Sequence, residues 1–273
     1  MELNSSSWRQ GDPVAAPQEN LASKPLRYSV LDVPVSAVSL DIARSLLEEW
    51  ANDQVARIVT VPDTSNIVRS QDDQRLLAIH RRAAMVVPDG TPLVWIGKAR
   101  GMTVSRTCGP DLMDHVLANS AIKGLKHYFY GGKPGVAERL KAEFERRYPG
   151  VRIVGAGTPP FRPLSEEELR SAADEIVASG ADVVWIGIST PKQEFLMADL
   201  EPLISATMLG VGAAFDFHTG EVRRAPRWMQ KVGIEWVYRL MKEPRRLWKR
   251  YLLMAPRFVF AITKEVLGGQ RFR

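Results

Sequence analysis

The sequence has 273 residues, a net charge of +6 and an apolar content of 45%, which is ordinary for a globular protein with a real core. The length allows one large domain or two small ones. The single cysteine, Cys108, excludes an intramolecular disulfide and suits a reducing compartment. We expect it to be a buried thiol. No run of 18 apolar residues occurs, so we expect no membrane-spanning helix.

The beginning of the chain differs in composition from the rest. Residues 1–25 are rich in Ser, Pro, Asn and Gln, and they lack the apolar core of a signal peptide. We interpret them as a flexible leader. The remaining chain divides into residues 26–222 and a basic segment, residues 223–273, which we expect to be a helical appendage.

Short apolar segments alternate with helical patterns through residues 26–222. The helical patterns surround Ile67–Ile79 and Leu112–Leu117, follow Pro134, and begin at Ser165, where Glu168 completes a capping box. This alternation predicts an α/β fold with a Rossmann-like parallel sheet and helices on both faces. The most apolar strand, 182–188, is expected near the centre. The predicted strands are residues 57–61, 85–87, 127–130, 151–154, 182–188 and 206–212.

In such a sheet, ligands bind beyond the carboxyl ends of the strands. The loop at 88–90 follows a strand directly, and Asp89 could act there as a general base. An ordinary turn is the alternative, because Asp and Gly are turn residues. The candidate loops are residues 60–66, 88–91, 131–135, 189–194 and 212–220.

The segment 189–194 (STPKQE) also follows a strand and opens a helix. Free N–H groups after a proline would form an anion site there, with Lys192 adding a charge and Gln193 an amide. A simple helix start is the alternative. Gly131 and Gly132 could cradle a phosphate, although a plain turn explains them equally well.

Several ligand-binding patterns are missing from the sequence. Residues 210–215 approach G-x-G-x-x-G but have Phe215 at the last position, which argues against dinucleotide binding. No Asp-x-Asp pair occurs, and the four histidines lack metal-ligand spacing. We therefore expect no metal and no cofactor. Any bound phosphates must be neutralised by arginines and helix N-termini.

The basic character of the protein belongs to its C-terminal segment. Residues 223–273 contain fourteen Lys and Arg and three Glu, a net charge of +11, whereas residues 1–222 carry −5. Aromatic residues are interleaved with these charges. This pattern suits an anionic membrane surface, phosphate groups or nucleic acid. A solvated basic helix packed on the domain is the fourth possibility.

An ordered set of motifs from about residue 28 to 260 resembles the WecG/TagA/CpsF family of bacterial glycosyltransferases. Each motif is modest alone, but the set in this order is specific. The motifs are residues 87–92 (VPDGTP), Arg106 with 109–112 (GPDL), 130–135 (YGGKPG), 191–194 (PKQE), 210–216 (GVGAAFD), Gly220 with 224–226 (RAP), 235–240 (EWVYRL) and 243–246 (EPRR).

The resemblance implies an inverting, metal-independent transferase that moves a sugar from a UDP-sugar to a polyprenyl-diphosphate-linked acceptor. The enzyme would act in bacterial surface or exopolysaccharide biosynthesis. It would be cytoplasmic and bound peripherally to the inner face of the cell membrane. A homo-oligomer is possible. By the same resemblance, the catalytic residues would be Asp89 as the general base, Gln193 in contact with the donor or acceptor in the same pocket, and Arg106 near the active site. The arginines that would close over the site and hold diphosphate are Arg224, Arg239 and Arg246.

The remaining candidate substrate-binding residues are Thr60, Asp63, Gly131, Gly132, Lys192 and Asp216. The family usually has Thr-x-Asn after the first core strand, whereas this chain has TVPDTSN at residues 60–66. A gapless match places Asp63 on the Asn position, and a one-residue shift recovers Thr60. The donor therefore stays open among N-acetylmannosaminyl, N-acetylmannosaminuronyl and β-glucosyl types.

Two other classes of function compete with this one. A non-enzymatic nucleic-acid-binding protein could use the basic segment, but the acidic body and the lack of a recognised module argue against nucleic acid. A nicotinamide-dependent sugar-nucleotide enzyme would need the glycine fingerprint that is missing here.

Overall fold

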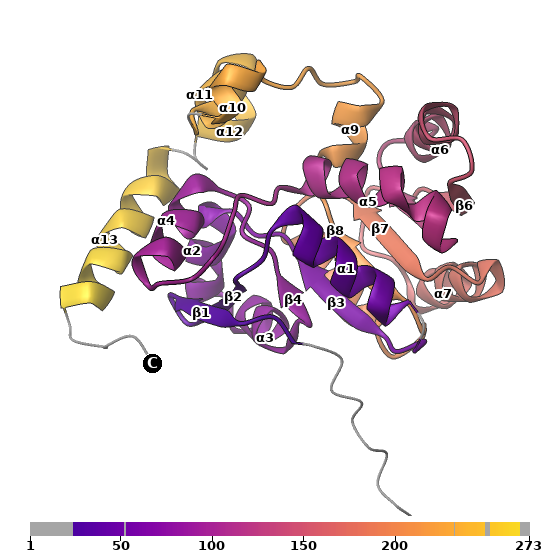
Figure 1. Ribbon diagram of the computed structural model, residues 1–273, viewed down its shortest axis with the longest axis horizontal. Coiled ribbons are helices and arrows are strands. Elements are labelled where there is room, and N and C mark those ends of the chain that lie inside the picture. Colours follow the sequence, from indigo (N-terminus) through magenta and orange to yellow (C-terminus); the bar gives the residue numbers. More distant parts are fainter. Residues whose placement is uncertain (1–23, 52, 232, 249–251, 268–273) are drawn as a thin grey trace, which may run out of the picture.

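The computed structural model describes residues 24–51, 53–231, 233–248 and 252–267, so nearly all of the predicted leader lies outside it. Its centre is a six-stranded parallel sheet in the order β4-β3-β8-β7-β5-β6 (Figure 1). This confirms the α/β, Rossmann-like prediction and every predicted strand. The strands are β3 (Arg57–Thr60), β4 (Met85–Val86), β5 (Lys126–Gly131), β6 (Arg152–Gly157), β7 (Val183–Gly187) and β8 (Thr207–Gly210).

The strand β7 lies between β5 and β8, near the centre, as its uniform apolar character predicts. Its side chains alternate between two cores, with Val184 and Ile186 on one face and Val183 and Trp185 on the other. The last strand, β8, is inserted between β3 and β7. The carboxyl ends of the first and last core strands therefore lie side by side.

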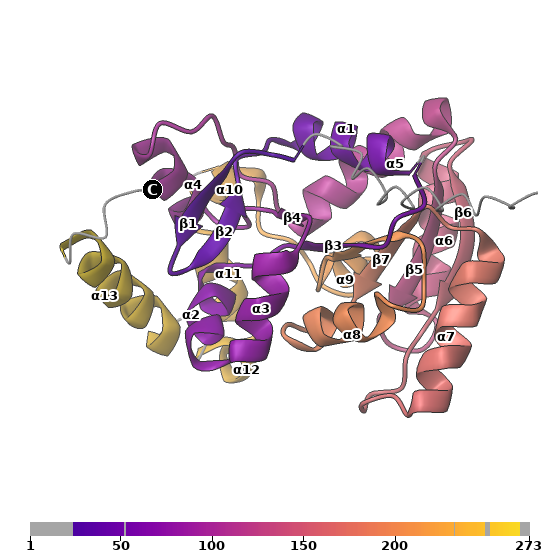
Figure 2. The same ribbon diagram turned by 90° about the horizontal axis from the view of Figure 1, so that it is seen from below.

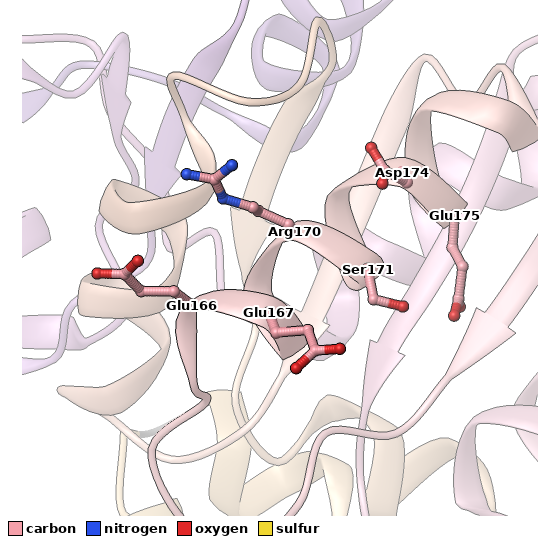
Figure 3. A pocket seen from close by; sticks show the side chains of 6 residues that line it. All are labelled: Glu166, Glu167, Arg170, Ser171, Asp174 and Glu175. Carbon is pink, nitrogen blue, oxygen red and sulfur yellow. The ribbon is translucent and has the colours of Figure 1, made fainter.

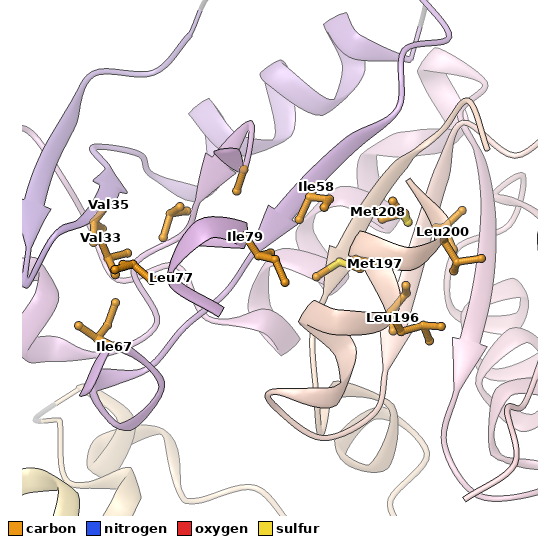
Figure 4. Packing of buried hydrophobic residues seen from close by; sticks show 14 of the residues in the cluster. Val33, Val35, Ile58, Ile67, Leu77, Ile79, Leu196, Met197, Leu200 and Met208 are labelled. Carbon is orange, nitrogen blue, oxygen red and sulfur yellow. The ribbon is translucent and has the colours of Figure 1, made fainter. Parts of the chain in front are cut away.

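Helices cover both faces of the sheet. One core receives side chains from α2 (Thr64–Asp72), α3 (Gln74–Arg82), α7 (Glu166–Ser179) and α8 (Lys192–Leu200), and part of it is drawn in Figure 4. The opposite core receives them from α1 (Leu40–Trp50), α5 (Gly109–Lys123), α6 (Val136–Arg147) and α9 (Ala214–His218). The helix α4 (Thr91–Ala99) contributes Leu93 and Val94 to the first core.

Two local features refine the sequence expectations. The single helical stretch expected around Ile67–Ile79 is two helices, because the carboxylate of Asp73 caps α3 by accepting from the backbone N–H of Leu76. An additional hairpin, β1 (Arg27–Val30) and β2 (Val33–Ser36), precedes α1. The predicted capping box of Ser165 and Glu168 is present at the start of α7.

The C-terminal appendage is helical, as predicted. It contains α10 (Arg227–Lys231), α11 (Glu235–Lys242), α12 (Pro244–Trp248) and α13 (Met254–Leu267). The helix α13 lies along α2 at one end of the molecule, which Figures 1 and 2 show from two sides. Phe258 is buried there, and Glu265 accepts hydrogen bonds from the backbone of Leu31 and from Arg100. Among the helices of the described residues, none combines the length and apolar character needed to cross a membrane.

Candidate active site

The loop after β4 places Asp89 at the carboxyl edge of the sheet. The backbone N–H of Thr107 donates to the carbonyl of Pro88 at 3.2 Å, which fixes the segment before α5 beside this loop. Asp89 is half-buried. The negative charge of Asp89 raises the pKa of both Arg106 and Cys108, so Asp89 is close enough to interact electrostatically with these two side chains.

Arg106 connects this loop to the appendage. Its guanidinium donates to Glu235 Oε2 at 2.6 Å and to the carbonyl of Gln230 at 3.4 Å. Burial alone would lower the pKa of Arg106, but its interactions with Cys108, Asp89 and Glu235 together outweigh burial and raise the pKa. Arg106 is therefore a permanent cation beside the predicted base.

Arg224 makes a second connection between the body and the appendage. Its guanidinium grips Asp111 with two N–H groups, one of them 2.9 Å from Asp111 Oδ2, and donates to Cys108 Sγ at 3.2 Å. Its Nε lies 3.6 Å from Glu235 Oε1. Although burial opposes it, this pairing lowers the pKa of Asp111. A bidentate fork of this kind is also the geometry that suits a phosphate.

Cys108 lies beneath these charges and is buried, as expected. Burial raises the pKa of its thiol, and the carboxylates of Asp89 and Asp111 raise it further. The thiol therefore stays protonated and donates to Asp111 at 2.9 Å. A neutral, buried thiol is a poor nucleophile. We refer to Asp89, Arg106, Cys108, Asp111, Arg224 and Glu235 as the charged cluster.

The appendage is seated closely on the site. At Gly233, φ is +78°, and a Cβ atom there would come within 2.7 Å of Thr91 Oγ1. Thr91 begins α4 and is two residues from Asp89. Glycine at 233 thus lets the appendage approach the loop that carries the predicted base.

A second polar group lies at the ends of β3, β7 and β8. Gln193 Oε1 accepts from the backbone N–H of Gly212 at 2.9 Å. Glu194 Oε1 accepts from Asn66 Nδ2 at 3.0 Å, and from Thr190 and Gln193 at 3.3 Å. We refer to Asn66, Thr190, Gln193 and Glu194 as the amide network.

Burial raises the pKa of Glu194 in the amide network. Glu194 Oε2 and Asn66 Oδ1 are buried and have no hydrogen-bond partner among the described residues. The amide network adjoins the charged cluster. A Cβ at Gly109, next to Cys108, would lie 2.9 Å from the carbonyl oxygen of Val211, and the next residue, Gly212, donates its backbone N–H to Gln193 of the amide network.

Thr60 and Asp63 have structural partners of their own. Thr60 is fully buried in β3, with its hydroxyl 3.0 Å from His80 Nδ1. The carboxylate of Asp63 caps α2 by accepting from the backbone N–H of Asn66 at 2.9 Å. Substrate contact by either residue stays a prediction, and burial makes it harder for Thr60 than for Asp63.

The glycine pair after β5 is shaped by close packing. A Cβ at Gly131 would lie 2.6 Å from the backbone of Gly187, and one at Gly132 would lie 2.7 Å from Val136. These contacts explain both glycines without a ligand, so phosphate binding there stays a prediction. Asp216 lies on α9 and is half-buried.

The other predicted cations lie on separate elements. Lys192 is exposed at the start of α8, with its ammonium 4.9 Å from the ring of Phe161. Arg239 on α11 stacks on Phe217 of α9 at 5.4 Å, and its buried Nε has no hydrogen-bond partner among the described residues. Arg246 belongs to α12, but its side chain lies outside the description.

A surface depression of about 580 Å³ lies away from both polar groups, along the start of α7 (Figure 3). Four of its six lining residues are acidic, so it is unsuited to an anionic ligand. In the part of the chain that the structure describes, no three His, Cys, Asp or Glu side chains are grouped to hold a metal ion. Independence of metals stays a prediction.

Sequence reasoning named Asp89, Arg106, Gln193 and Arg224 but did not assign roles to their partners. Glu235 and Asp111 stand inside motifs that were recognised, so their charge next to a named arginine was the available signal. Glu194 also stands inside a recognised motif and Asn66 inside the segment 60–66, but nothing in the sequence signals their mutual contact, which spans 128 positions.

The chain also matches a known protein family. The model of the WecG/TagA/CpsF family of glycosyl transferases matches residues 28–272, which is nearly the whole chain. This family implies a glycosyltransferase of cell-envelope polymer synthesis that uses a nucleotide-sugar donor and an acceptor. The chain belongs to the WecG/TagA/CpsF family of glycosyl transferases.

Proposed function

We propose that this glycosyltransferase inverts the configuration of the sugar and transfers it from a UDP-sugar to a polyprenyl-diphosphate-linked acceptor. The observation that carries the proposal is the charged cluster. A carboxylate at the end of a core strand, Asp89, lies beside one half-buried guanidinium, Arg106, and a second half-buried guanidinium, Arg224, reaches the same cluster from the appendage. A base next to two cations is what a reaction with a diphosphate leaving group requires.

In this mechanism, Asp89 accepts the proton of the acceptor hydroxyl as that oxygen attacks the anomeric carbon. The bond between the anomeric carbon and the diphosphate breaks on the opposite side, and the nucleoside diphosphate leaves with the electron pair. Arg106 and Arg224 stabilise the negative charge that develops on it. This arrangement supplies the neutralisation without a metal ion, so we include metal independence in the proposal.

The amide network is suited to the sugar of the donor. Asn66 and Gln193 lie on the helices that follow β3 and β7, and the buried Asn66 Oδ1 and Glu194 Oε2 have no hydrogen-bond partner among the described residues. Sugars are bound mainly through hydroxyl hydrogen bonds, which these two oxygens could accept. This assignment leaves the donor open between N-acetylmannosamine, N-acetylmannosaminuronic acid and glucose nucleotides.

We place the acceptor at the inner face of the cell membrane, where the appendage would dock peripherally. The outward side of α13 carries Val259, Phe260 and Leu267, which are 63%, 73% and 81% exposed. These positions recur at helical spacing on one side, and the exposed cations Arg257 and Lys264 flank them. An apolar stripe with flanking cations suits the headgroup region of anionic lipid.

The transfer reaction is tested with a panel of UDP-sugars and a short-chain polyprenyl-diphosphate acceptor, with and without an excess of chelator. We expect one donor to give a lipid-linked product whose glycosidic bond has the inverted configuration, at the same rate with chelator. No product from any donor would contradict the proposed reaction. Loss of product with chelator, restored by magnesium or manganese, would remove metal independence alone.

Membrane docking is tested by sedimentation with vesicles that contain anionic lipid. Replacing Phe260 and Leu267 by Gln should weaken binding by at least tenfold, because burying one such side chain contributes about 1.5–3 kcal/mol. The matched control replaces Ile122 and Val177, which are exposed on the body, by Gln. Equal binding of both double variants would contradict docking through α13.

A further inference from the structure

Glu235 occupies the space between the two arginines of the charged cluster. Its Oε2 accepts from Arg106 at 2.6 Å, and its Oε1 lies 3.6 Å from Nε of Arg224. The carboxylate is only 13% exposed, and the two guanidinium groups are 26% and 22% exposed. One carboxylate thus connects a cation of the body with a cation of the appendage.

The balance of charge makes this position a problem for an anionic ligand. The charged cluster contains three carboxylates and two guanidinium groups, with Cys108 a neutral thiol. A diphosphate would add further negative charge to a cluster that is already net negative. Repulsion between the carboxylates of the charged cluster and the diphosphate would strongly disfavour diphosphate binding, because the site is partly buried.

The geometry points to Glu235 as an internal anion that holds the diphosphate position between Arg106 and Arg224 and is displaced when the substrate binds. This inference rests on the proposed function, because it takes the diphosphate of the substrate as the ligand. Arginine binds phosphate oxygens through the same N–H groups that now bind the carboxylate. Diphosphate and Glu235 therefore compete for one site.

Displacement also has a consequence for α11. Arg239 lies four residues after Glu235, on the same side of the helix, and its buried Nε has no hydrogen-bond partner among the described residues. A diphosphate in the place of Glu235 would be within one helical turn of this third cation. Glu235 is therefore a positioning residue, since its carboxylate pairs with both arginines and holds them in place before substrate arrives.

The test is a calorimetric titration of the full chain with inorganic diphosphate. Glu235→Gln should bind diphosphate about 10-fold more tightly than the unmodified protein, which corresponds to about 1.4 kcal/mol. Glu235→Ala supplies a second neutral variant and should shift in the same direction. Glu235→Asp retains the charge and should bind within about threefold of the unmodified protein.

The matched control is Glu265→Gln. Glu265 pairs with Arg100 at 2.8 Å and is 14% exposed, so it resembles Glu235 in pairing and burial but lies away from the charged cluster. This variant should leave diphosphate affinity unchanged. If both neutral variants of Glu235 bind diphosphate as weakly as the unmodified protein, or more weakly, Glu235 does not occupy the diphosphate position and the inference is wrong.

Inorganic diphosphate carries no sugar, so the titration reports on the anion site alone. A protein that shows the expected shift but transfers no sugar from any donor retains the displacement and loses the proposed reaction. A protein that transfers sugar but shows no shift retains the reaction and loses the displacement.

Discussion

The body, residues 24–222, and the appendage, residues 223–267, differ in how much of their side-chain surface is buried. Every residue of β7 is buried, and Phe129 in β5 is fully enclosed. In the appendage, α11 has no buried residue, and Phe260 on α13 is 73% exposed. The body is therefore organised around its own cores, whereas the appendage is attached by ion pairs and a few apolar anchors such as Leu247 and Phe258. The charged cluster, our candidate active site, lies where the two meet.

The largest expected effect comes from removing the appendage. A chain that ends at residue 222 should still unfold cooperatively, because both cores of the sheet lie almost entirely within the body. It should lose transferase activity by about 10²–10³, since it lacks Arg224, one of the two guanidinium groups that would stabilise the leaving diphosphate. Thermal unfolding and a soluble-acceptor assay measure the two quantities. Full activity in the shortened chain would show that the body contains the whole site.

The contrast in burial is tested by one substitution made twice. Phe129→Ala should lower the free energy of unfolding by about 3–5 kcal/mol, because it leaves a cavity in a closed core. Phe260→Ala should change it by less than about 0.5 kcal/mol. Denaturant titration of both variants gives the comparison. Similar losses in the free energy of unfolding would contradict the exposure of Phe260 and would mean that a partner, such as a second copy of the chain, covers α13.

A third test uses pH, because the body contains two buried neutral imidazoles. Burial lowers the pKa of His80 to about 4 and that of His127 to about 3. His127 accepts from Trp185 Nε1 at 3.2 Å, and its Nε2 lies 2.8 Å from Ser120 Oγ, which is satisfied by the neutral form.

Both folded-state pKa values lie below the unfolded value near 6.5. As pH falls below 6.5, the two imidazoles take up protons in the unfolded chain but not in the folded chain. Their contribution to the free energy of unfolding is therefore fully present above pH 6.5 and decreases toward pH 4. Each imidazole should contribute about 1.4 kcal/mol of loss per pH unit. Denaturant titrations between pH 7.5 and 4.5 measure this slope. A constant free energy of unfolding across the window would contradict the burial of neutral histidines.

The smallest effect is expected at the contact between the two regions. Gly233→Ala forces a side chain onto φ +78° and toward Thr91, whereas Gly101→Ala meets the same backbone cost at φ +74° with open space around it. Both should cost about 1 kcal/mol of stability. Only the variant at 233 should also lower kcat/KM, because it lifts the appendage from the loop of Asp89. Equal kcat/KM values would show that this contact does not matter for the site.

The fold could be predicted from the sequence because its signals are local. Six apolar segments and the turns between them predict the parallel sheet, and the capping box of Ser165 marks the start of α7. The β1–β2 hairpin was not predicted, since its two-residue turn uses Leu31 and Asp32 at positive φ in place of the usual Asn-Gly pair. A hairpin cannot be predicted from local sequence signals when its turn contains residues that are uncommon at those positions.

The candidate site was only half predictable for a related reason. Asp89 follows a recognisable strand, and Arg224 stands in a recognisable motif, so both were named. Their pairing with residues of other elements depends on contacts across more than a hundred positions, as between Arg106 and Glu235. No periodicity or propensity reports such a contact, so the position of Glu235 between the two arginines was visible only in the structure.

The most direct measurement of the central claim, that the charged cluster is the catalytic site, is the turnover of Asp89→Asn. Asp73→Asn is the matched control, because Asp73 caps α3 and asparagine caps a helix equally well. We predict that Asp89→Asn keeps the melting temperature and donor affinity but loses about 10²–10⁴ in turnover, the usual contribution of a general base. The control should keep near-normal turnover. Near-normal turnover in Asp89→Asn would contradict the account.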